Sequence, residues 1–313
     1  MRECNISCLF DGGDEADAKG DIEQAKIIKE ALLGVESHYA MGNHDWFAHE
    51  TGSNLAYIYD SGKMNQNGNA DRHYYYIDNH QKKIRYIIMS SFSEITPESD
   101  PAAGPGYESD QITWLSNVAL NVESGWKILI FTHAVYYMHM GTGAFTDIAN
   151  NSDFLNAVNN YSGNGEIVAI FQGHIHRDTF IYTDSGIPII VTTCDRNVPY
   201  TNAQGYTDIN VDRTAGTIKE QAFDVVGVDF NDETIKTIRI GAGNNRIFHY
   251  TVLNIVSSVT LTSTLSGTVT WSSSDDNVAT VSSGVVSAVG HGSIDIIATN
   301  EDEEFEVWHA IVA

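Results

Sequence analysis

Basic residues are scarce in this sequence: 17 Lys and Arg stand against 41 Asp and Glu, which gives a formal net charge of -24 at pH 7. A surface this acidic repels the phosphate backbone of nucleic acids and the headgroups of anionic lipids. A nucleic-acid polymer is therefore not an expected partner unless metal ions reverse the field locally. The alternative is that the acidic excess only maintains solubility.

Cysteine is also scarce, because Cys4, Cys8 and Cys194 are the only three. They form neither a CxxC zinc pattern nor a disulfide framework, so the redox compartment stays undecided. No hydrophobic run approaches the roughly 18 residues that a membrane-spanning helix needs, and we expect no membrane span. The strongest run, 126–133, has the length of a strand. The first residues contain no long apolar stretch or small-residue cleavage site typical of a secretion signal.

The 313 residues are 42% hydrophobic and 19% charged, which is typical of a globular chain with one large and one small domain. Up to about residue 250, short apolar runs alternate with helical patterns. The patterns predict strands at 5–10, 37–41, 85–91, 127–132, 167–172 and 187–193, and helices at 20–33, 109–122 and 154–161. This interleaving of strands and helices favours packed α/β (α+β) layers.

From about residue 255 the helical periodicity stops, and Ser, Thr and Val dominate. Short β-branched runs separated by turns of Ser, Asp, Asn and Gly lie at 258–263, 267–271, 278–282, 284–288, 293–299 and 304–311. The pattern predicts a small antiparallel β-sandwich. We therefore expect two domains, residues 1–250 and 255–313, with the boundary near residues 249–254.

Four short polar motifs each follow a predicted strand of the first domain. They are the stretch from Phe10 to Asp17, Gly42-Asn-His-Asp45, the single His133, and Gly173-His-Ile-His176. Ligands of open α/β sheets bind beyond the carboxyl ends of strands, so the four loops are expected to converge. Each motif alone is more often a turn or a satisfied histidine, but the four in this order favour a common site.

The side chains of these motifs are those of a mixed metal site. An aspartate, an asparagine carbonyl and several imidazoles suit divalent Mn, Fe, Zn or Ni. Two such ions about 3.5–4 Å apart can hold a phosphate, activate a water and stabilise the attacking and leaving oxygens. Glycines beside the ligands allow the backbone to turn sharply and to approach the ions closely.

The four motifs resemble motifs two to five of the calcineurin-like metallophosphoesterase superfamily, over most of residues 1–240. The resemblance implies a four-layer α/β/β/α sandwich with two packed β-sheets, and a dinuclear metal site. It also implies that Asp14 bridges both metals, that Asn43, His133 and His174 bind the second metal, and that His176 binds the first.

In the same resemblance, His44 faces the substrate phosphate, where it stabilises charge or protonates the leaving oxygen. Asp45 orients the His44 ring, since a carboxylate on one imidazole nitrogen fixes the tautomer and raises the basicity of the other. The implied reaction is hydrolysis of a phosphate mono- or diester, on a small molecule or nucleotide, by a metal-activated hydroxide.

The sequence departs from the superfamily in its first motif. The superfamily begins with Asp-x-His on a strand, but only 12 residues precede Gly13 here and none form that motif. The first metal then keeps only Asp14 and His176, too few for a tight site. Either the sequence is an N-terminally incomplete copy of an enzyme, or it is a shortened and weakened member. The rival function is a catalytically dead scaffold in a surface or phage adhesion protein.

Residues 271–288 resemble the bacterial immunoglobulin-like (Ig-like) domains of surface and phage proteins, through their Trp-Ser-Ser-Ser turn, Val-Ala-Thr-Val strand and Gly-Val-Val hairpin. The resemblance covers about 255–313 and implies a spacer or a weak adhesive module for glycan or cell wall. It therefore implies an extracellular or cell-surface location.

The loops 62–76 and 136–147 of the first domain are rich in Tyr, Asn, Gly and His. We expect them either to line the rim of the substrate site or to be plain loops.

Overall fold

The computed structural model describes residues 8–13, 30, 36–42, 67–69, 73–91, 106–138, 145–148, 150–193 and 214–313. The chain forms two compact units. The first comprises Met1–His176, Ile189–Val191 and Asn202–Tyr206, and the second comprises Arg177–Pro188, Thr192–Thr201 and Thr207–Ala313. The predicted helix at 20–33 lies outside the described residues, apart from Glu30.

The first unit is built around one sheet. Its described elements are β1 (Leu9–Asp11), β2 (Ser37–Tyr39), β3 (Gly68–Asn69), β4 (Tyr74–Asn79), β5 (Ile84–Met89), α5 (Ser109–Trp114), η1 (Leu115–Ala119), β6 (Lys127–Thr132), β7 (Tyr136–Met138), β8 (Phe145–Asp147), α6 (Asn151–Asn159), β9 (Glu166–Gln172) and β11 (Pro188–Val191). Six strands follow one another in the order β11-β9-β6-β5-β4-β3. The pairs from β5 to β11 are parallel, and those from β3 to β5 are antiparallel.

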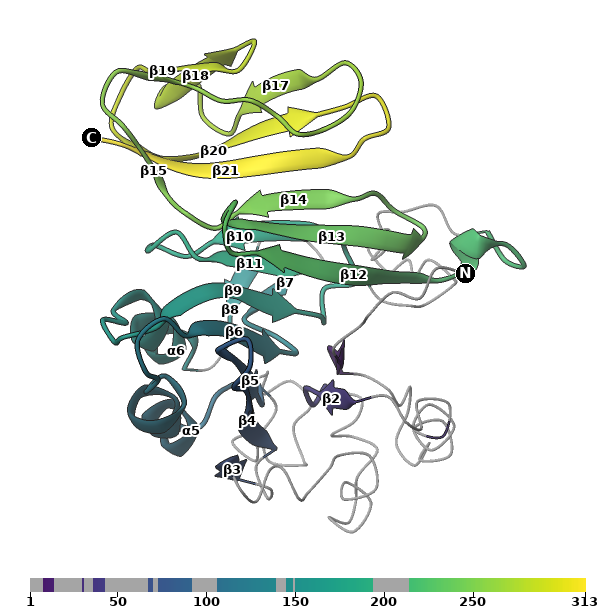
Figure 1. Ribbon diagram of the computed structural model, residues 1–313, viewed down its shortest axis with the longest axis vertical. Coiled ribbons are helices and arrows are strands. Elements are labelled where there is room, and N and C mark those ends of the chain that lie inside the picture. The colour runs from purple at the N-terminus through teal and green to yellow at the C-terminus, as the bar shows by residue number, and fades with distance from the viewer. Residues whose placement is uncertain are drawn as a thin grey trace. The chain divides into compact units, whose positions relative to one another are not determined.

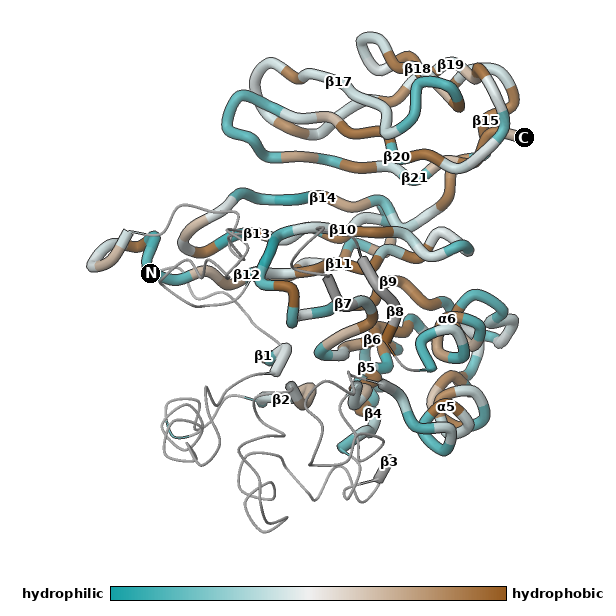
Figure 2. The backbone as a smooth tube through the Cα atoms, turned by 180° about the vertical axis from the view of Figure 1, so that it is seen from behind, coloured by the Kyte–Doolittle hydropathy of each residue, from teal (hydrophilic) through white to brown (hydrophobic). Residues whose placement is uncertain are grey.

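The central strands are apolar along nearly their whole length, as parallel strands covered on both faces are. Every residue of β5 is buried, and Val168, Ala169 and Ile170 of β9 are fully buried. Figure 2 shows β6 and β9 as hydrophobic stretches of the tube. The helices α5 and α6 lie on one side of this sheet (Figure 1). These uninterrupted runs explain why the sequence locates β5, β6 and β9 within two residues.

The helix predicted at 109–122 differs from the observed one. It is α-helical over Ser109–Trp114 and then widens to a π-helix over Leu115–Ala119. The hydroxyls of Thr113 and Ser116 each donate to the carbonyl four residues earlier. Such back-bonding competes with the backbone ladder, and single π turns are typical of such interruptions.

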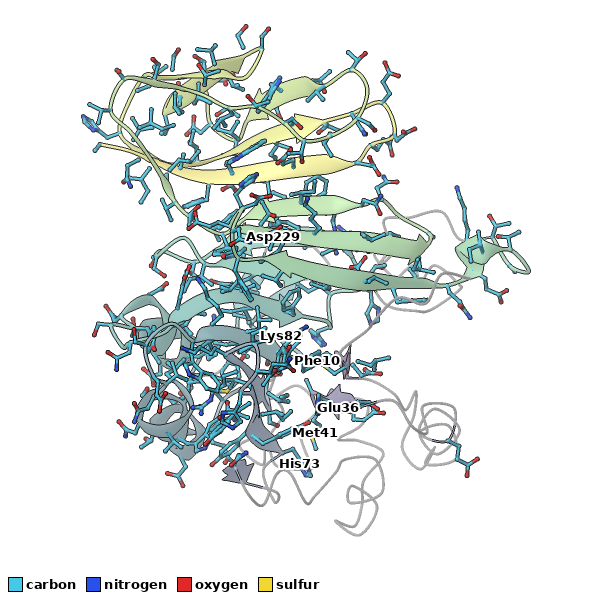
Figure 3. The ribbon with its side chains drawn as sticks, viewed as in Figure 1. Phe10, Glu36, Met41, His73, Lys82 and Asp229 are labelled. Atoms are coloured by element: carbon cyan, nitrogen blue, oxygen red, sulfur yellow. The ribbon has the colours of Figure 1, made fainter. Side chains whose placement is uncertain are left out.

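The short parallel pair β1–β2 brings the N-terminal motif to the sheet. Phe10 of β1 stacks on Phe131 of β6 with ring centroids 3.8 Å apart, and Phe131 stacks on Phe171 of β9 at 5.0 Å. Figure 3 labels Phe10 beside this sheet. The stack fixes the end of β1 near the carboxyl ends of β6 and β9, where Gly12, His133 and Gly173 follow.

The second unit consists almost entirely of strands. They are β10 (Thr179–Tyr182), β12 (Ala222–Asp229), β13 (Thr234–Gly241), β14 (Arg246–His249), β15 (Leu253–Ile255), β16 (Ser258–Thr260), β17 (Thr270–Ser273), β18 (Ala279–Ser282), β19 (Val285–Ala288), β20 (Gly292–Thr299) and β21 (Phe305–Val312), with a 3-10 turn η2 at Ile218–Glu220. The larger sheet has the order β12-β13-β14-β21-β20-β17, with β15 also paired to β21. A second sheet has the order β16-β19-β18.

The two sheets of the C-terminal part enclose an apolar core, as the alternating pattern predicts. Its buried members are Ile255, Ala279, Val286, Ile294, Ile296, Ala310 and Val312. The pairing of β14 with β21 was not apparent in the sequence. These strands run parallel, with Arg246 opposite Phe305 and Phe248 opposite Val307. The ring of Phe248 also contacts Phe180 and Phe305. Strands on both sides of the expected boundary near residue 250 therefore share one sheet.

Candidate functional site

His133 and His174 meet where two parallel strands end. The register pairs Thr132 of β6 with Gln172 of β9, so the residues that follow leave the sheet side by side. The Nε2 atom of His133 lies 3.0 Å from the Nδ1 atom of His174, and the two rings are edge to face. His133 is only 1% exposed. Two imidazoles predicted to belong to one site thus lie within contact of each other.

The backbone of Gly12 determines the tautomer of His133. The Nδ1 atom of His133 lies 2.5 Å from the Gly12 carbonyl oxygen. A carbonyl only accepts, so Nδ1 carries the proton and a neutral ring presents a lone pair at Nε2. A carbonyl on the far nitrogen is the usual second partner of a metal-binding histidine. The nitrogen facing His174 is therefore the one able to bind a cation.

The turn that carries His174 and His176 is backbone-strained. Both residues adopt left-handed φ values, 61° and 56°, and Ile175 between them is buried against Val191. The Ile175 amide donates to the Gly173 carbonyl at 2.7 Å. Left-handed conformations at residues other than Gly and Asn cost about 1–3 kcal/mol and cluster at functional sites. The buried Ile175 side chain, which lies between the two histidines in sequence, therefore holds this loop against the sheet.

Glycines let three backbones approach His133. Gly13 has φ +94°, and a Cβ there would lie 2.5 Å from the Ala40 oxygen, 2.6 Å from the Gly42 nitrogen and 2.8 Å from His133 Nδ1. A Cβ at Gly173 would lie 3.1 Å from the Gly12 oxygen. The Gly13 amide donates to the Asp11 carboxylate at 2.9 Å, which tightens the turn after β1. The three motif loops converge at His133 because these positions have no side chain.

The remaining predicted site residues are only partly placed. Asp14, Asn43, His44 and Asp45 lie outside the described residues, although their neighbours Gly13 and Gly42 lie beside each other. His176 is half-buried on the turn after β9. About half of the two predicted rim loops, 62–76 and 136–147, also lies outside the described part, and their described residues lie largely in the strands β3, β4, β7 and β8. The roles assigned to these side chains stay predictions.

The donor set fits a divalent ion as far as it is described. Two nitrogens about 2.1 Å from one ion, at an angle of about 90–110°, lie about 3.0–3.4 Å apart. The 3.0 Å between His133 Nε2 and His174 Nδ1 matches that separation. Within the described ranges no group of three His, Cys, Asp or Glu side chains gathers. Also among the described residues, no helix has the length and apolarity to cross a membrane.

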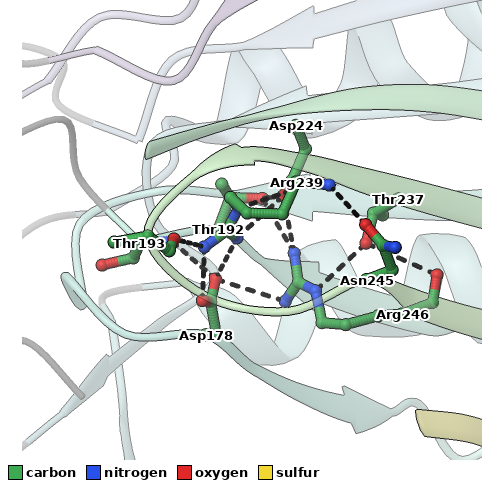
Figure 4. Close-up of polar contacts among 9 residues, drawn as sticks. Asp178, Thr192, Thr193, Asp224, Thr237, Arg239, Asn245 and Arg246 are labelled. Carbon is green, nitrogen blue, oxygen red and sulfur yellow. Dashed lines mark hydrogen bonds and ion pairs between the residues drawn. The ribbon is translucent and has the colours of Figure 1, made fainter. Parts of the chain in front are cut away.

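A second buried polar cluster belongs to the other unit (Figure 4). Arg239 donates to both oxygens of Asp178 at 2.6 and 2.7 Å, to both oxygens of Asp224 at 2.8 and 3.3 Å, and to the Ala242 carbonyl at 2.7 Å. Its five N–H groups are all used. Arg246 adds a bond to Asp224 at 2.7 Å.

The charges of this second cluster balance within it. Burial alone disfavours the ionised Asp224, but the Arg239 hydrogen bonds and the charge of Arg246 outweigh it and lower the pKa of Asp224. At Arg239 burial disfavours the charged form, but the hydrogen bonds and charges of Asp178 and Asp224 outweigh it and raise the pKa. With every donor of Arg239 engaged, the cluster offers no open group for a ligand. We interpret it as structural.

Two contributors to the histidine site were missed in the sequence: the Gly12 carbonyl and Gln172. Gln172 ends β9, is 4% exposed and bonds the loop after His133 through three hydrogen bonds. The available signal was a polar residue at the end of an otherwise apolar strand, directly before Gly173. The Gly12 carbonyl had no signal beyond the pair of glycines, because backbone acceptors are not encoded by residue type.

Comparisons with known proteins agree with the two-part organisation. Residues 252–311 match the family of bacterial Ig-like domains (group 2). The structure is similar to the crystal structure of a dimetal phosphatase from Danio rerio, with a TM-score of 0.51 and 12% sequence identity, over 79% of this chain and 84% of that one. No curated protein sequence matches the chain. At this identity the likeness to the phosphatase concerns the fold alone.

Proposed function

We propose that the chain, which joins a dimetal-phosphatase fold to a bacterial Ig-like domain at 252–311, is a metal-dependent hydrolase of phosphate mono- or diesters. The supporting observation is the pair formed by His133 Nε2 and His174 Nδ1, 3.0 Å apart at the carboxyl ends of two parallel strands. The proposal includes the four-layer α/β/β/α arrangement of the larger domain, over residues 1–250, and a small-molecule or nucleotide phosphoester as substrate.

In this proposal the chain supplies two unequal metal sites. His133, His174, Asn43 and Asp14 hold one ion, and Asp14 with His176 holds part of the other. Divalent Mn, Fe, Zn or Ni bound there would neutralise phosphate charge and acidify a water. The Gly12 carbonyl keeps the proton of His133 on Nδ1, away from the ion.

In this proposal, the residues after Gly42 supply the proton that the leaving group takes up. His44 would face the phosphate and stabilise its charge or protonate the leaving oxygen, and Asp45 would hold the far nitrogen of the ring in the tautomer this requires. The side chain of His44 acts as a general acid, so its removal lowers turnover more than it lowers substrate binding.

The Ig-like domain favours a second candidate function. Bacterial Ig-like domains of this group occur in bacterial surface proteins, and the match covers 252–311. A scaffold whose phosphatase fold is inactive, carried outside a bacterial cell or on a virion, would use the sandwich to contact glycan or cell wall. An extracellular location is part of both proposals.

Hydrolysis of p-nitrophenyl phosphate and bis-p-nitrophenyl phosphate with added Mn²⁺ tests the enzyme against the scaffold. We expect turnover that depends on Mn²⁺ and falls at least about 100-fold in His174→Ala and Asn43→Ala, since even outer-shell partners of metal ligands matter 10–100-fold. His80→Ala is the matched control, because this exposed histidine lies in the turn between β4 and β5 and touches Trp126. Absence of Mn²⁺-dependent turnover, or equal loss in the control, overturns the proposal.

A further inference from the structure

The segment that leaves β6 after His133 is held by side chains up to Tyr136, the first residue of β7. The amides of Ala134, Val135 and Tyr136 donate, in turn, to the Ser91 hydroxyl at 3.0 Å and to the Gln172 side-chain oxygen at 3.0 and 3.2 Å. Backbone groups buried outside regular structure need such partners. Three consecutive amides are thus satisfied by only two side chains.

The carbonyls of the same loop are also bonded to side chains. The Gln172 amide nitrogen donates to the Tyr136 carbonyl at 2.8 Å, so Gln172 uses both ends of its amide on one loop. The Tyr107 hydroxyl donates to the Ala134 carbonyl at 2.8 Å. Burial raises the pKa of Tyr107 above its ordinary value, which keeps this hydroxyl a donor. Tyr107 is itself fixed through the Asn150 side chain, which donates to its carbonyl at 2.7 Å.

Gln172 links the two histidine loops directly. It is the last residue of β9, two positions before His174, and it grips the loop that begins one position after His133. It is 4% exposed, and Tyr107 and Ser91 are fully buried. Any movement of the 134–136 loop relative to β9 would break the bonds of Gln172. Gln172 therefore couples the segment after His133 to the strand that precedes His174.

We propose that Gln172 is a positioning residue of the metal site: its amide brackets Val135 and Tyr136 and so holds His133 Nε2 at ligand distance from His174 Nδ1. This inference rests on the proposed function, because it assigns Gln172 a role in binding the ion that these histidines hold. Ligands held within about 0.5 Å of the productive geometry need such a supporting shell. Tyr107 supports the same loop from its other end.

Cobalt binding to the full chain tests the role of Gln172. Gln172→Met keeps the volume and removes the bracket, and we expect a 10–100-fold weaker Co²⁺ affinity by calorimetry, as for other groups that orient metal ligands. We also expect altered visible absorption bands of the bound Co²⁺, which report ligand geometry. Gln111→Met is the matched control: Gln111 is fully buried and brackets the amide and carbonyl of Ser90 at 2.8 Å each, without a bond to the His133 loop.

Each outcome decides one of the two proposals. Wild-type Co²⁺ affinity and spectrum in Gln172→Met, or equal changes in Gln111→Met, overturn the positioning role and leave the hydrolase standing. A wild-type chain that binds no Co²⁺ overturns both. If Gln172→Met does not fold, Tyr107→Phe replaces it, because it removes only the hydroxyl bonded to Ala134; we then expect a several-fold loss of affinity with the same spectral change, and an unchanged affinity contradicts the inference.

Discussion

The histidine cluster of the first unit and the arginine cluster of the second both bury polar side chains at strand ends, but their polar groups face different partners. Arg239 uses all five N–H donors on Asp178, Asp224 and Ala242. His133 uses one ring nitrogen on Gly12 and turns the other toward a second imidazole. In the arginine cluster opposite charges pair with each other, whereas in the histidine cluster two imidazole nitrogens face each other.

This difference in bonding distinguishes a structural cluster from a candidate functional site, which residue type alone cannot do. Both clusters would be found by a search for buried ionisable residues, since perturbed groups occur in ion-pair networks as well as in active sites. Saturated donors and acceptors identify the structural cluster. Facing imidazole nitrogens, strained histidines in the turn and glycines at points of close approach distinguish the candidate functional one. Two substitutions test this interpretation directly, one in each cluster, and a third tests a separate buried carboxylate that is bonded to a histidine.

The largest effect is expected from breaking the saturated cluster. Arg239→Met leaves the carboxylates of Asp178 and Asp224 buried with fewer partners, and removing one member of a buried ion pair costs about 3–5 kcal/mol. Urea denaturation of the full chain measures the loss. Lys236→Met, on the exposed face of the same strand, should change the free energy of unfolding by less than about 0.5 kcal/mol. A loss at Arg239 as small as that of the control would show that the cluster is not structural.

A smaller effect is expected at Gly13, where the histidine cluster requires a residue without a side chain. Gly13→Ala places a Cβ 2.5 Å from the Ala40 oxygen at a left-handed φ, which we expect to cost about 1–3 kcal/mol. The new methyl also displaces His133, so Mn²⁺ affinity should fall with stability in calorimetry. Gly227→Ala is the counterpart, because nothing lies within 4 Å of its added Cβ. That change should be neutral or stabilise by about 0.5 kcal/mol; equal losses in both variants would contradict the role of Gly13.

The last prediction concerns stability over a limited pH range, at a histidine bonded to a buried carboxylate. Glu306 is fully buried and accepts bonds from His249 Nε2 at 2.8 Å, from the Ser263 hydroxyl at 2.8 Å and from the Thr264 amide at 2.7 Å. Burial opposes its ionisation, but His249 and these donors prevail and lower its pKa below the ordinary 4.5. A lowered carboxyl pKa gives stability that is present above about pH 4.5 and is lost as pH falls through the lower folded value.

Replacing Glu306 by Gln removes that titration. We expect the stability advantage of the wild type over Glu306→Gln, about 1–3 kcal/mol near pH 7, to shrink as the pH falls from 5 toward 3. Denaturation curves of both proteins across this range measure the difference. An advantage that stays constant with pH would show that the bonds to Glu306 do not depend on its charge.

Much of the fold could be predicted from the sequence because single-strand patterns are local. The apolar run at 127–132 gave β6 without error, and the β-branched runs after residue 255 each correspond to a strand. Partner choice is not local. Arg246 and Phe305 are far apart in the chain, and nothing in their patterns indicates that β14 and β21 pair in parallel. The strands β12 and β13 were missed because Asp224 and Arg239 interrupt their apolar pattern to pair inside the arginine cluster.

The candidate site was predictable where side chains carry the chemistry. His133 and His174 were expected together because both follow parallel strands, and they do lie together. The groups that orient them were not predictable, since the Gly12 carbonyl is common to every residue and Gln172 resembles any polar residue that ends a strand. The ligand roles of Asp14, Asn43 and His176, and the catalytic roles of His44 and Asp45, stay predictions.

The parallel pairing of β14 with β21 affects how the protein can be divided. Dividing the chain near residue 250 would remove one neighbour of β14 in one fragment and one neighbour of β21 in the other, and so leave one edge of each strand bare. Bare strand edges attract other bare edges, so each fragment would tend to associate with itself or to precipitate. The sandwich is therefore a poor candidate for transplantation as a free-standing tag, and shared expression of both halves is the better route to reassembling the whole.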